Sequence, residues 1–210
     1  MNAPGESSAH LLLKHPAMQR VPTDRLELFQ CRAFLPAELC AELITLIDAG
    51  RRPSTIADDN GDTAFRTSET CDLPAAALAV QRLEAALHGL NGIEPAHGEP
   101  VQGQRYAPEQ EFKAHTDYFE PGGRDYERYC AKAGQRTWTF MVYLNAVEAG
   151  GATRFKQIGK TVQPEAGKLL CWNNRLPDGS VNPATLHHGM KVRQGVKYII
   201  TKWYREREWG

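Results

Sequence analysis

The 210-residue sequence lacks three features that would point to particular partners. It has no apolar run of about 18 residues, the length that a membrane-spanning helix requires. Its first residues, MNAPGESSAHLLLKH, lack the basic start and long apolar stretch of a secretory signal. Neither sign of charge is in excess, with 25 basic and 25 acidic residues, so composition does not suggest a nucleic-acid partner. These absences predict a cytoplasmic protein that binds neither membrane nor nucleic acid.

Cysteine is also sparse. The five cysteines are odd in number, widely scattered, and contain no CxxC pair: Cys31, Cys40, Cys71, Cys130 and Cys171. A disulfide framework or a cysteine-based zinc site would require paired or clustered residues. We therefore expect free, buried thiols in a reducing cytosol. Nothing in the sequence indicates the oligomeric state.

The length and a hydrophobic content of 41% fit one packed domain. Residues 1–24 are polar, contain three prolines and show no sustained period, so they are predicted to form a flexible N-terminal arm. Residues 25–210 are then a single domain, with a helical layer over 25–99 and a β core over 100–210.

Two amphipathic helices are expected in the helical layer. The first covers LPAELCAELITLIDAG (residues 35–50), where apolar residues recur at helical spacing and Gly50 provides a stop. The second covers the alanine-rich residues 74–90, which end before Gly92. Residues 25–34 are predicted to be a strand and residues 51–70 a loop.

After residue 100 the pattern changes to short β-rich runs separated by turn residues. The runs are EFKAHTDYF, TWTFMVYLNAV, KLLCWNN and VKYIITKWYR. Such spacing predicts a sandwich or barrel. Residues 119–135 interrupt the strands as a long, glycine-containing insertion, which is interpreted as a mobile loop beside the active site.

His115 and Asp117 stand two residues apart in one of these runs, so on a strand they point to the same face. Such a pair is common by chance and more often lies on a solvated strand. His187 supplies a third candidate ligand, with the adjacent His188 as its alternative. Two histidines and one carboxylate on one face of a metal form the facial triad of non-haem Fe(II) oxygenases.

Lys197 begins the last β-rich run. On a strand, Lys197, Ile199, Thr201 and Trp203 would share one face. If that face points inward, the lysine needs an anionic partner, which a dicarboxylate co-substrate would supply. If it points outward, Val196, Tyr198 and Ile200 form the core instead. The pattern alone does not choose between the two faces.

Several ordered blocks resemble the prolyl 4-hydroxylase family of Fe(II)/2-oxoglutarate-dependent dioxygenases, over roughly residues 100–207. They are RYAPEQEFKAHTDYF, QRTWTFMVYLNAVEAGGATRF, KLLCWNNRLPDGSVNPATLHHG and GVKYIITKWYRER. The resemblance implies an α+β fold, a double-stranded β-helix (jelly-roll) core with N-terminal helices packed on one sheet. It further implies hydroxylation of a C–H bond with Fe(II), 2-oxoglutarate and O2, release of succinate and CO2, and ascorbate as reductant.

The same resemblance assigns roles to individual positions, with no catalytic residue beyond the metal centre. Its pattern favours His187 over His188 as the distal ligand. The metal ligands would be His115, Asp117 and His187; the 2-oxoglutarate contacts Lys197, Tyr106 and Thr153; and the substrate contacts Arg136, Trp203 and, more loosely, Arg66 in FRTSET. Two departures, Glu109-Gln110 for the family's Gly-Gln and Met190-Lys191-Val192 for Cys-Pro-Val, remove no metal or oxoacid contact.

The main hypothesis is therefore a peptidyl-proline 4-hydroxylase acting on a peptide or protein substrate. The first alternative keeps the chemistry but acts on a free amino acid or another small molecule. The second is a non-catalytic binding module that has kept the fold. The third is a zinc or manganese hydrolase, in which the Lys197 strand would have no role and a glutamate base would be missing.

Overall fold

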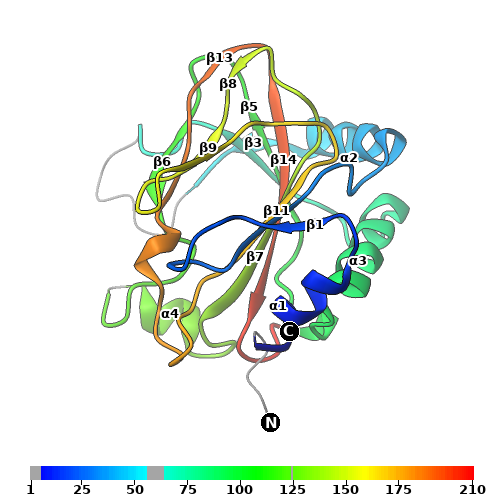
Figure 1. Cartoon of the computed structure of the whole chain (residues 1–210). Coiled ribbons are helices and arrows are strands. Elements are labelled where there is room, and N and C mark those ends of the chain that lie inside the picture. The colour runs from blue at the N-terminus through cyan, green and yellow to red at the C-terminus, as the bar shows by residue number, and fades with distance from the viewer. Residues whose placement is uncertain (1–5, 56–63, 124) are drawn as a thin grey trace.

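The computed structural model describes residues 6–55, 64–123 and 125–210 (Figure 1). Within these ranges the strands form an eight-stranded sheet, a four-stranded sheet and a two-stranded ribbon, and all their pairings are antiparallel. The eight-stranded sheet contains, in spatial order, β1 (Met18–Arg20), β2 (Leu28–Cys31), β11 (Leu169–Asn173), β7 (Arg136–Tyr143), β14 (Lys197–Arg205), β5 (Gln102–Tyr106), β4 (Glu69–Asp72) and β3 (Arg52–Pro53). The four-stranded sheet contains β10 (Lys160–Val162), β9 (Thr153–Phe155), β12 (His187–Gly189) and β6 (Phe112–His115), and the ribbon pairs β13 (Val192–Gln194) with β8 (Ala149–Gly150).

The two predicted helices, α2 (Ala37–Gly50) and α3 (Leu78–Asn91), lie together on one side of the molecule (Figure 1). Their buried residues pack with those of the large sheet in one hydrophobic cluster, as Leu43 of α2 and Phe140 of β7 do. α3 ends as expected at Gly92, whose left-handed backbone (φ 64°) lets its amide donate to the His88 carbonyl. It begins four residues later than predicted because residues 74–77 form a turn, in which the Ala77 amide donates to Pro74.

A second hydrophobic cluster joins the large sheet to the smaller one. It contains Met141 and Tyr143 of β7, Ile199 of β14 and Phe155 of β9. Alternate residues of β7 therefore face different cores, because successive side chains on a strand point to opposite sides. Two facing sheets with helices on the outer face of one match the predicted double-stranded β-helix core. None of the described helices combines the length and apolarity needed to cross a bilayer.

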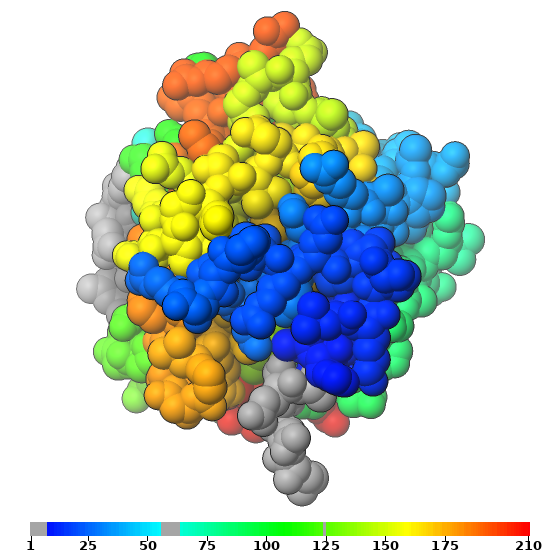
Figure 2. All heavy atoms as spheres, viewed as in Figure 1, coloured from blue at the N-terminus to red at the C-terminus, as the bar shows by residue number. Residues whose placement is uncertain are grey.

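The N-terminal segment differs from the flexible arm predicted for residues 1–24. Residues 1–5 lie outside the described residues, but the next ones form α1 (Glu6–Lys14) and then β1. Leu12 of α1 is completely buried, because it packs into the same hydrophobic cluster as the buried residues of α2 and α3. Figure 2 shows the segment, in blue, lying against the yellow and orange parts of the chain, where Arg25 donates to the Gln157 carbonyl at 2.6 Å.

The predicted helical layer also contributes strands to the large sheet. β2 pairs with β11, and β4 pairs with β5, so residues 25–99 are not purely a helical layer. The strand expected over residues 25–34 is shortened to β2. The loop expected over 51–70 contains β3 and the start of β4, and residues 56–63 within it lie outside the described residues. The five cysteines are free and buried, as predicted.

The insertion at residues 119–135 contains a short helix, α4 (Tyr126–Cys130), and its two ends are joined. The Gln135 side chain accepts from the Phe119 amide at 2.9 Å and donates to the Phe119 carbonyl at 2.7 Å. Arg207 donates to the carbonyls of Cys130 and Ala131 at the end of α4. The base of the insertion is thus fixed by the side chain of Gln135, just before β7, and by that of Arg207 in the C-terminal segment.

Glu109, where the family resemblance expects glycine, has a left-handed backbone with φ 69°. This conformation costs a residue with a Cβ atom about 1–2 kcal/mol. The exposed ion pairs of Glu109 with Lys191 and Arg193, at 3.3 and 3.6 Å, return only part of that cost. Glu109→Gly is therefore expected to leave the free energy of unfolding unchanged or raise it by up to about 1 kcal/mol, as measured by urea denaturation. The control Glu42→Gly, within α2, should lower it by about 1 kcal/mol, and an equal loss in Glu109→Gly would contradict the strain argument.

Candidate metal centre

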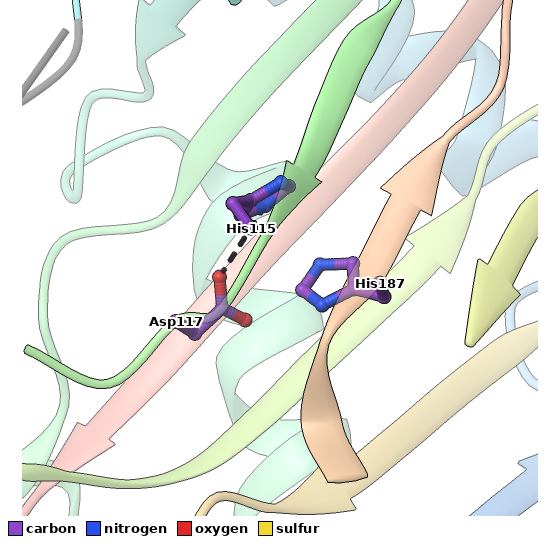
Figure 3. Close-up of side chains that lie close together, drawn as sticks. All are labelled: His115, Asp117 and His187. Carbon is purple, nitrogen blue, oxygen red and sulfur yellow. Dashed lines mark ion pairs between the residues drawn. The ribbon is translucent and has the colours of Figure 1, made fainter. Parts of the chain in front are cut away.

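His115, Asp117 and His187 converge between the two sheets (Figure 3). One potential ligand atom from each residue lies within 4.8 Å of those of the other two. His115 ends β6 and His187 begins β12, and the two residues are direct partners across the ladder. Sequence reasoning thus identified three residues that the fold brings together, although about 70 residues separate the first from the last.

Backbone carbonyls fix the tautomer of both histidines. Nδ1 of His115 is 2.8 Å from the Lys113 carbonyl, and Nδ1 of His187 is 2.9 Å from the Thr185 carbonyl. Because a carbonyl oxygen only accepts, each Nδ1 carries the proton and donates it. Each Nε2 is left with a free lone pair, which is the arrangement of metal-ligating histidines.

The charge state of the cluster also suits a cation. Burial and the neighbouring His187 ring lower the pKa of His115 to about 3, so this imidazole is neutral at pH 7. Burial opposes ionisation of Asp117, but His187, His115 and Arg136 outweigh it and lower the pKa of this carboxyl below its usual value. An ionised carboxylate beside free imidazole lone pairs fits a divalent metal such as Fe(II).

Asp117 does not lie on the strand, as the two-residue spacing had suggested. β6 ends at His115, and Asp117 belongs to the turn that follows. Another strand, β7, orients it: Thr139 donates to Asp117 Oδ2 at 2.7 Å, and Arg136 donates to the Asp117 carbonyl at 3.3 Å. Asp117 Oδ1 lies 3.8 Å from His115 Nε2, on the side where the three ligand atoms meet (Figure 3).

A pocket of about 390 Å³, counted to its mouth, contains the three residues. Both apolar and polar side chains surround it. The lining residues are Gln104, Tyr106, Phe112, His115, Asp117, Met141, Thr153, Trp172, His187, Gly189, Lys197, Ile199, Thr201 and Trp203. The alternate residues of β14, from Lys197 to Trp203, therefore face inward, and the outward alternative for this strand is wrong.

Lys197 is 1% exposed and lines this pocket among hydroxyl groups and aromatic rings. Its Nζ lies 4.9 Å from the centre of the Tyr106 ring and 5.5 Å from that of Tyr143. Among the described residues, no carboxylate forms an ion pair with it. A buried ammonium without a counter-charge is costly, so this part of the pocket is suited to an anion.

The hydroxyl groups near Lys197 differ in whether their protons are free to bind an anion. Tyr143 donates to Thr153 Oγ1 at 2.6 Å, which leaves the Thr153 proton free for another acceptor. Tyr106 donates to Gln104 Oε1 at 2.6 Å, so its own proton is already used. Thr153 is thus the better placed of the two predicted hydroxyl donors, and the hydrogen bond from Tyr143 supports it.

The pKa of Lys197 predicts a pH dependence of co-substrate binding. Burial lowers this pKa from 10.5 to about 7, and a bound carboxylate would raise it again. Above pH 7, binding of 2-oxoglutarate should therefore take up a proton, and its affinity should fall by up to about tenfold per pH unit. Calorimetry at pH 6.5–8.5 in buffers of different ionisation enthalpy, with Mn(II) to prevent turnover, measures both effects. In Lys197→Arg, which stays charged, both should vanish; a pH-independent wild type would contradict the prediction.

The three predicted substrate contacts are placed differently. Trp203 lines the pocket, and its Nε1 has no hydrogen-bond partner among the described residues. Arg136 instead forms a two-point ion pair with Glu99 at 2.6 and 2.7 Å, and lies 4.0 Å from the Trp203 ring centre. Its donors are engaged by groups inside the protein. Arg136 therefore holds Trp203 and Asp117 in position through direct contacts.

Arg66, the third predicted contact, does not belong to the pocket lining. It donates to Ser68 Oγ at 3.1 Å, Thr70 Oγ1 at 2.9 Å and Gln102 Oε1 at 3.1 Å. Its guanidinium carbon also lies 4.8 Å from the centre of the Phe112 ring, which does line the pocket. Arg66 thus lies beside the site, where it is hydrogen-bonded to side chains of β4 and β5. His188, the rival ligand, points away from the cluster and pairs with Glu111 at 2.8 Å.

Sequence reasoning missed several residues that build the site. Tyr143 could have been found, since strand alternation places it on the same face as Thr139 and Met141. Glu99, the partner of Arg136, and Asn174, which donates to Thr139 at 2.9 Å, gave no usable signal. Each meets its partner only through the tertiary fold, from segments remote in sequence.

Fold and site together define a class of protein: an antiparallel double-stranded β-helix with a two-histidine, one-carboxylate cluster and a buried cation in one pocket. The family model of the 2OG-Fe(II) oxygenase superfamily matches residues 101–205, which include all three residues of the cluster. The chain belongs to this superfamily. It is a 2-oxoglutarate-dependent dioxygenase of the prolyl 4-hydroxylase type, as its relatives indicate.

The relatives agree in sequence and structure. Probable prolyl 4-hydroxylase 10 of Arabidopsis thaliana is 30% identical over 200 residues, which cover 84% of this chain and 68% of that protein. The viral collagen prolyl hydroxylase of Paramecium Bursaria Chlorella virus-1, solved with 2-oxoglutarate, is 25% identical with a TM-score of 0.67, covering 91% and 97% of the two chains. A Pseudomonas putida prolyl-4-hydroxylase, 21% identical with a TM-score of 0.60 and coverage of 95% and 98%, shares the fold.

Proposed function

We propose that the chain uses Fe(II), 2-oxoglutarate and O2 to hydroxylate peptidyl proline at C4, with release of succinate and CO2. The observation that carries the proposal is the presence of two binding features in one pocket: the cluster of His115, Asp117 and His187, and the buried ammonium of Lys197. A metal hydrolase would need the first feature but has no use for the second. A non-catalytic module would need neither.

The proposed roles follow from the free donor atoms. Nε2 of His115, Nε2 of His187 and Oδ1 of Asp117 would hold the iron, because their other polar atoms are already engaged. Lys197 would pair with the far carboxylate of 2-oxoglutarate, and Thr153 would donate its free proton to the same group. When bound, the iron supplies the oxidative chemistry that consumes 2-oxoglutarate and O2 and transfers a hydroxyl group to the substrate.

The remaining work of the protein is orientation and exclusion of water. Lys197 fixes one end of the co-substrate and the three ligands fix the other, so the co-substrate is held at two points. Apolar side chains between them, among which are Met141, Ile199 and Trp172, limit the access of water. A dry pocket strengthens the ion pair at Lys197 and protects reactive species from side reactions.

A peptide substrate is supported by the relatives and by the aromatic lining of the pocket. The matched plant proteins are named as probable prolyl 4-hydroxylases, and the viral protein is named as a collagen prolyl hydroxylase. Phe112 and Trp203 give the pocket an aromatic lining, and the Trp203 indole N–H has no partner among the described residues; these features suit a proline ring and a peptide carbonyl. We further propose ascorbate as the reductant that maintains Fe(II), and the cytoplasm as location, where reducing conditions preserve the free thiols.

Mass spectrometry of the products tests the substrate. Proline-rich peptides incubated with enzyme, Fe(II), 2-oxoglutarate and ascorbate should gain one oxygen atom on proline, and the 4-hydroxyproline should be found after hydrolysis. Matched peptides with alanine in place of proline should remain unmodified. Hydroxylation of free amino acids with no reaction on any peptide would contradict the peptide assignment and leave the oxygenase chemistry in place.

A further inference from the structure

Two hydrogen bonds connect Asp117 to a buried asparagine that is not itself a metal ligand. Thr139 Oγ1 donates to Asp117 Oδ2 at 2.7 Å, and Asn174 Nδ2 lies 2.9 Å from Thr139 Oγ1. Thr139 and Asn174 are each 0% exposed, and Asp117 is 7% exposed. The three side chains come from β7, from the segment after β11 and from the turn after β6, so only the folded core assembles them.

The connection has one direction. An amide nitrogen only donates, so Asn174 occupies a lone pair of Thr139 and leaves the single hydroxyl proton for Asp117. The reverse orientation of the amide would place two acceptors, Asn174 Oδ1 and the carboxylate, against one proton. The carboxylate can only accept and the Asn174 amide nitrogen only donates, so both partners favour the same polarity of the Thr139 hydroxyl, with its proton directed to Asp117.

We propose that Asn174 is a positioning residue that acts through Thr139 to fix which oxygen of Asp117 faces the metal. With Oδ2 engaged by Thr139, Oδ1 is the oxygen left on the side of His115 Nε2. The carboxylate is thereby held as a one-oxygen ligand. This inference rests on the proposed function, because it assigns a role within the iron site.

The Asn174 side chain is not needed for the local backbone. Its amide donates to the Thr137 carbonyl, and its carbonyl accepts from the Asn182 amide, bonds that any residue other than proline could form. Its Oδ1 is buried without a partner among the described residues, which opposes stability. An apolar side chain of similar size would avoid that cost, so the polar group at this position serves the site rather than the fold.

A double-mutant cycle on metal affinity tests the connection. Apo-protein of the wild type, Thr139→Val, Asn174→Leu and the double variant is titrated anaerobically with Fe(II) and with Co(II), whose visible absorption also reports the ligand set. Each single variant should bind metal about 10- to 100-fold more weakly. The double variant should be no weaker than Thr139→Val alone, because Asn174 acts only through Thr139.

Three further variants make the result specific. Asn173→Ala removes the adjacent amide, which donates to Glu27 at 2.8 Å, and should bind metal like the wild type. Thr139→Ser keeps the hydroxyl and should retain wild-type affinity. If circular dichroism shows that Asn174→Leu does not fold, the smaller Asn174→Ala takes its place in the cycle.

Two results would overturn the inference. One is wild-type metal affinity in a folded Asn174 variant. The other is a loss in the double variant equal to the product of the two single losses, which would mean that Asn174 acts independently of Thr139. Failure of the wild type itself to bind either metal is distinguishable from both, and would overturn the proposed function together with this inference.

Discussion

Lys197→Ala is expected to weaken 2-oxoglutarate binding by about 100- to 5,000-fold. Removal of one partner of a buried charge pair costs about 3–5 kcal/mol, because the other charge is left in the pocket without compensation. The expected change is a rise in the KM for 2-oxoglutarate and in its dissociation constant. Affinity for Fe(II) should change little, since the ligands belong to β6, β12 and the turn after β6.

Lys202 provides a matched control on the same strand. It is 4% exposed, but it faces the helices and pairs with Glu84 at 2.5 Å. Lys202→Ala should lower the free energy of unfolding and leave the KM for 2-oxoglutarate unchanged. Calorimetric titration of both variants with 2-oxoglutarate separates the two effects, and an unchanged affinity in Lys197→Ala would exclude Lys197 as the co-substrate anchor.

His115→Ala and His187→Ala are expected to lower 2-oxoglutarate turnover by at least about 1,000-fold, because the metal provides the reactive centre. Each substitution removes one of the two free Nε2 lone pairs, and either variant should also lose tight Fe(II) binding. Metal content after anaerobic reconstitution and gel filtration measures this loss directly. Both variants should remain folded, since the two side chains face the pocket and do not belong to the hydrophobic cluster between the helices and the large sheet.

His188 is the control for this pair. It neighbours His187 in sequence, but it contacts Glu111 on the other face of β12. His188→Ala should retain wild-type iron content and activity. Loss of iron in His188→Ala, with retention in His187→Ala, would reverse the assignment of the distal ligand.

The fold could be predicted from the sequence where the pattern was strong. The helices over 35–50 and 74–90, the strands near residues 112, 136, 169 and 197, and the free cysteines are all present. The N-terminal segment was misjudged because α1 is short and its apolar residues lie within a polar context. Strand β2 was predicted too long and β4 was not predicted. Both are short segments with weak strand propensity, which pair with a central sheet only in the folded protein.

The candidate site was predictable in its ligands but not in its supports. The spacing of His115 and Asp117 suggested one shared face, yet Asp117 is oriented from outside its strand by Thr139 and Arg136. Arg136 was expected to meet the substrate, whereas Glu99 engages its donors. Such partners come from segments that meet only in the folded core, so no local sequence pattern predicts them.

We propose that this pocket couples a metal and 2-oxoglutarate to peptide hydroxylation. The most direct test measures succinate formed from 2-oxoglutarate under Fe(II), ascorbate and O2, with and without proline-rich peptides, for the wild type beside His115→Ala and Lys197→Ala. We expect peptide-stimulated succinate, equimolar with 4-hydroxyproline, that collapses in both variants. Absence of 2-oxoglutarate binding and turnover in the iron-loaded wild type would contradict the proposed dioxygenase activity.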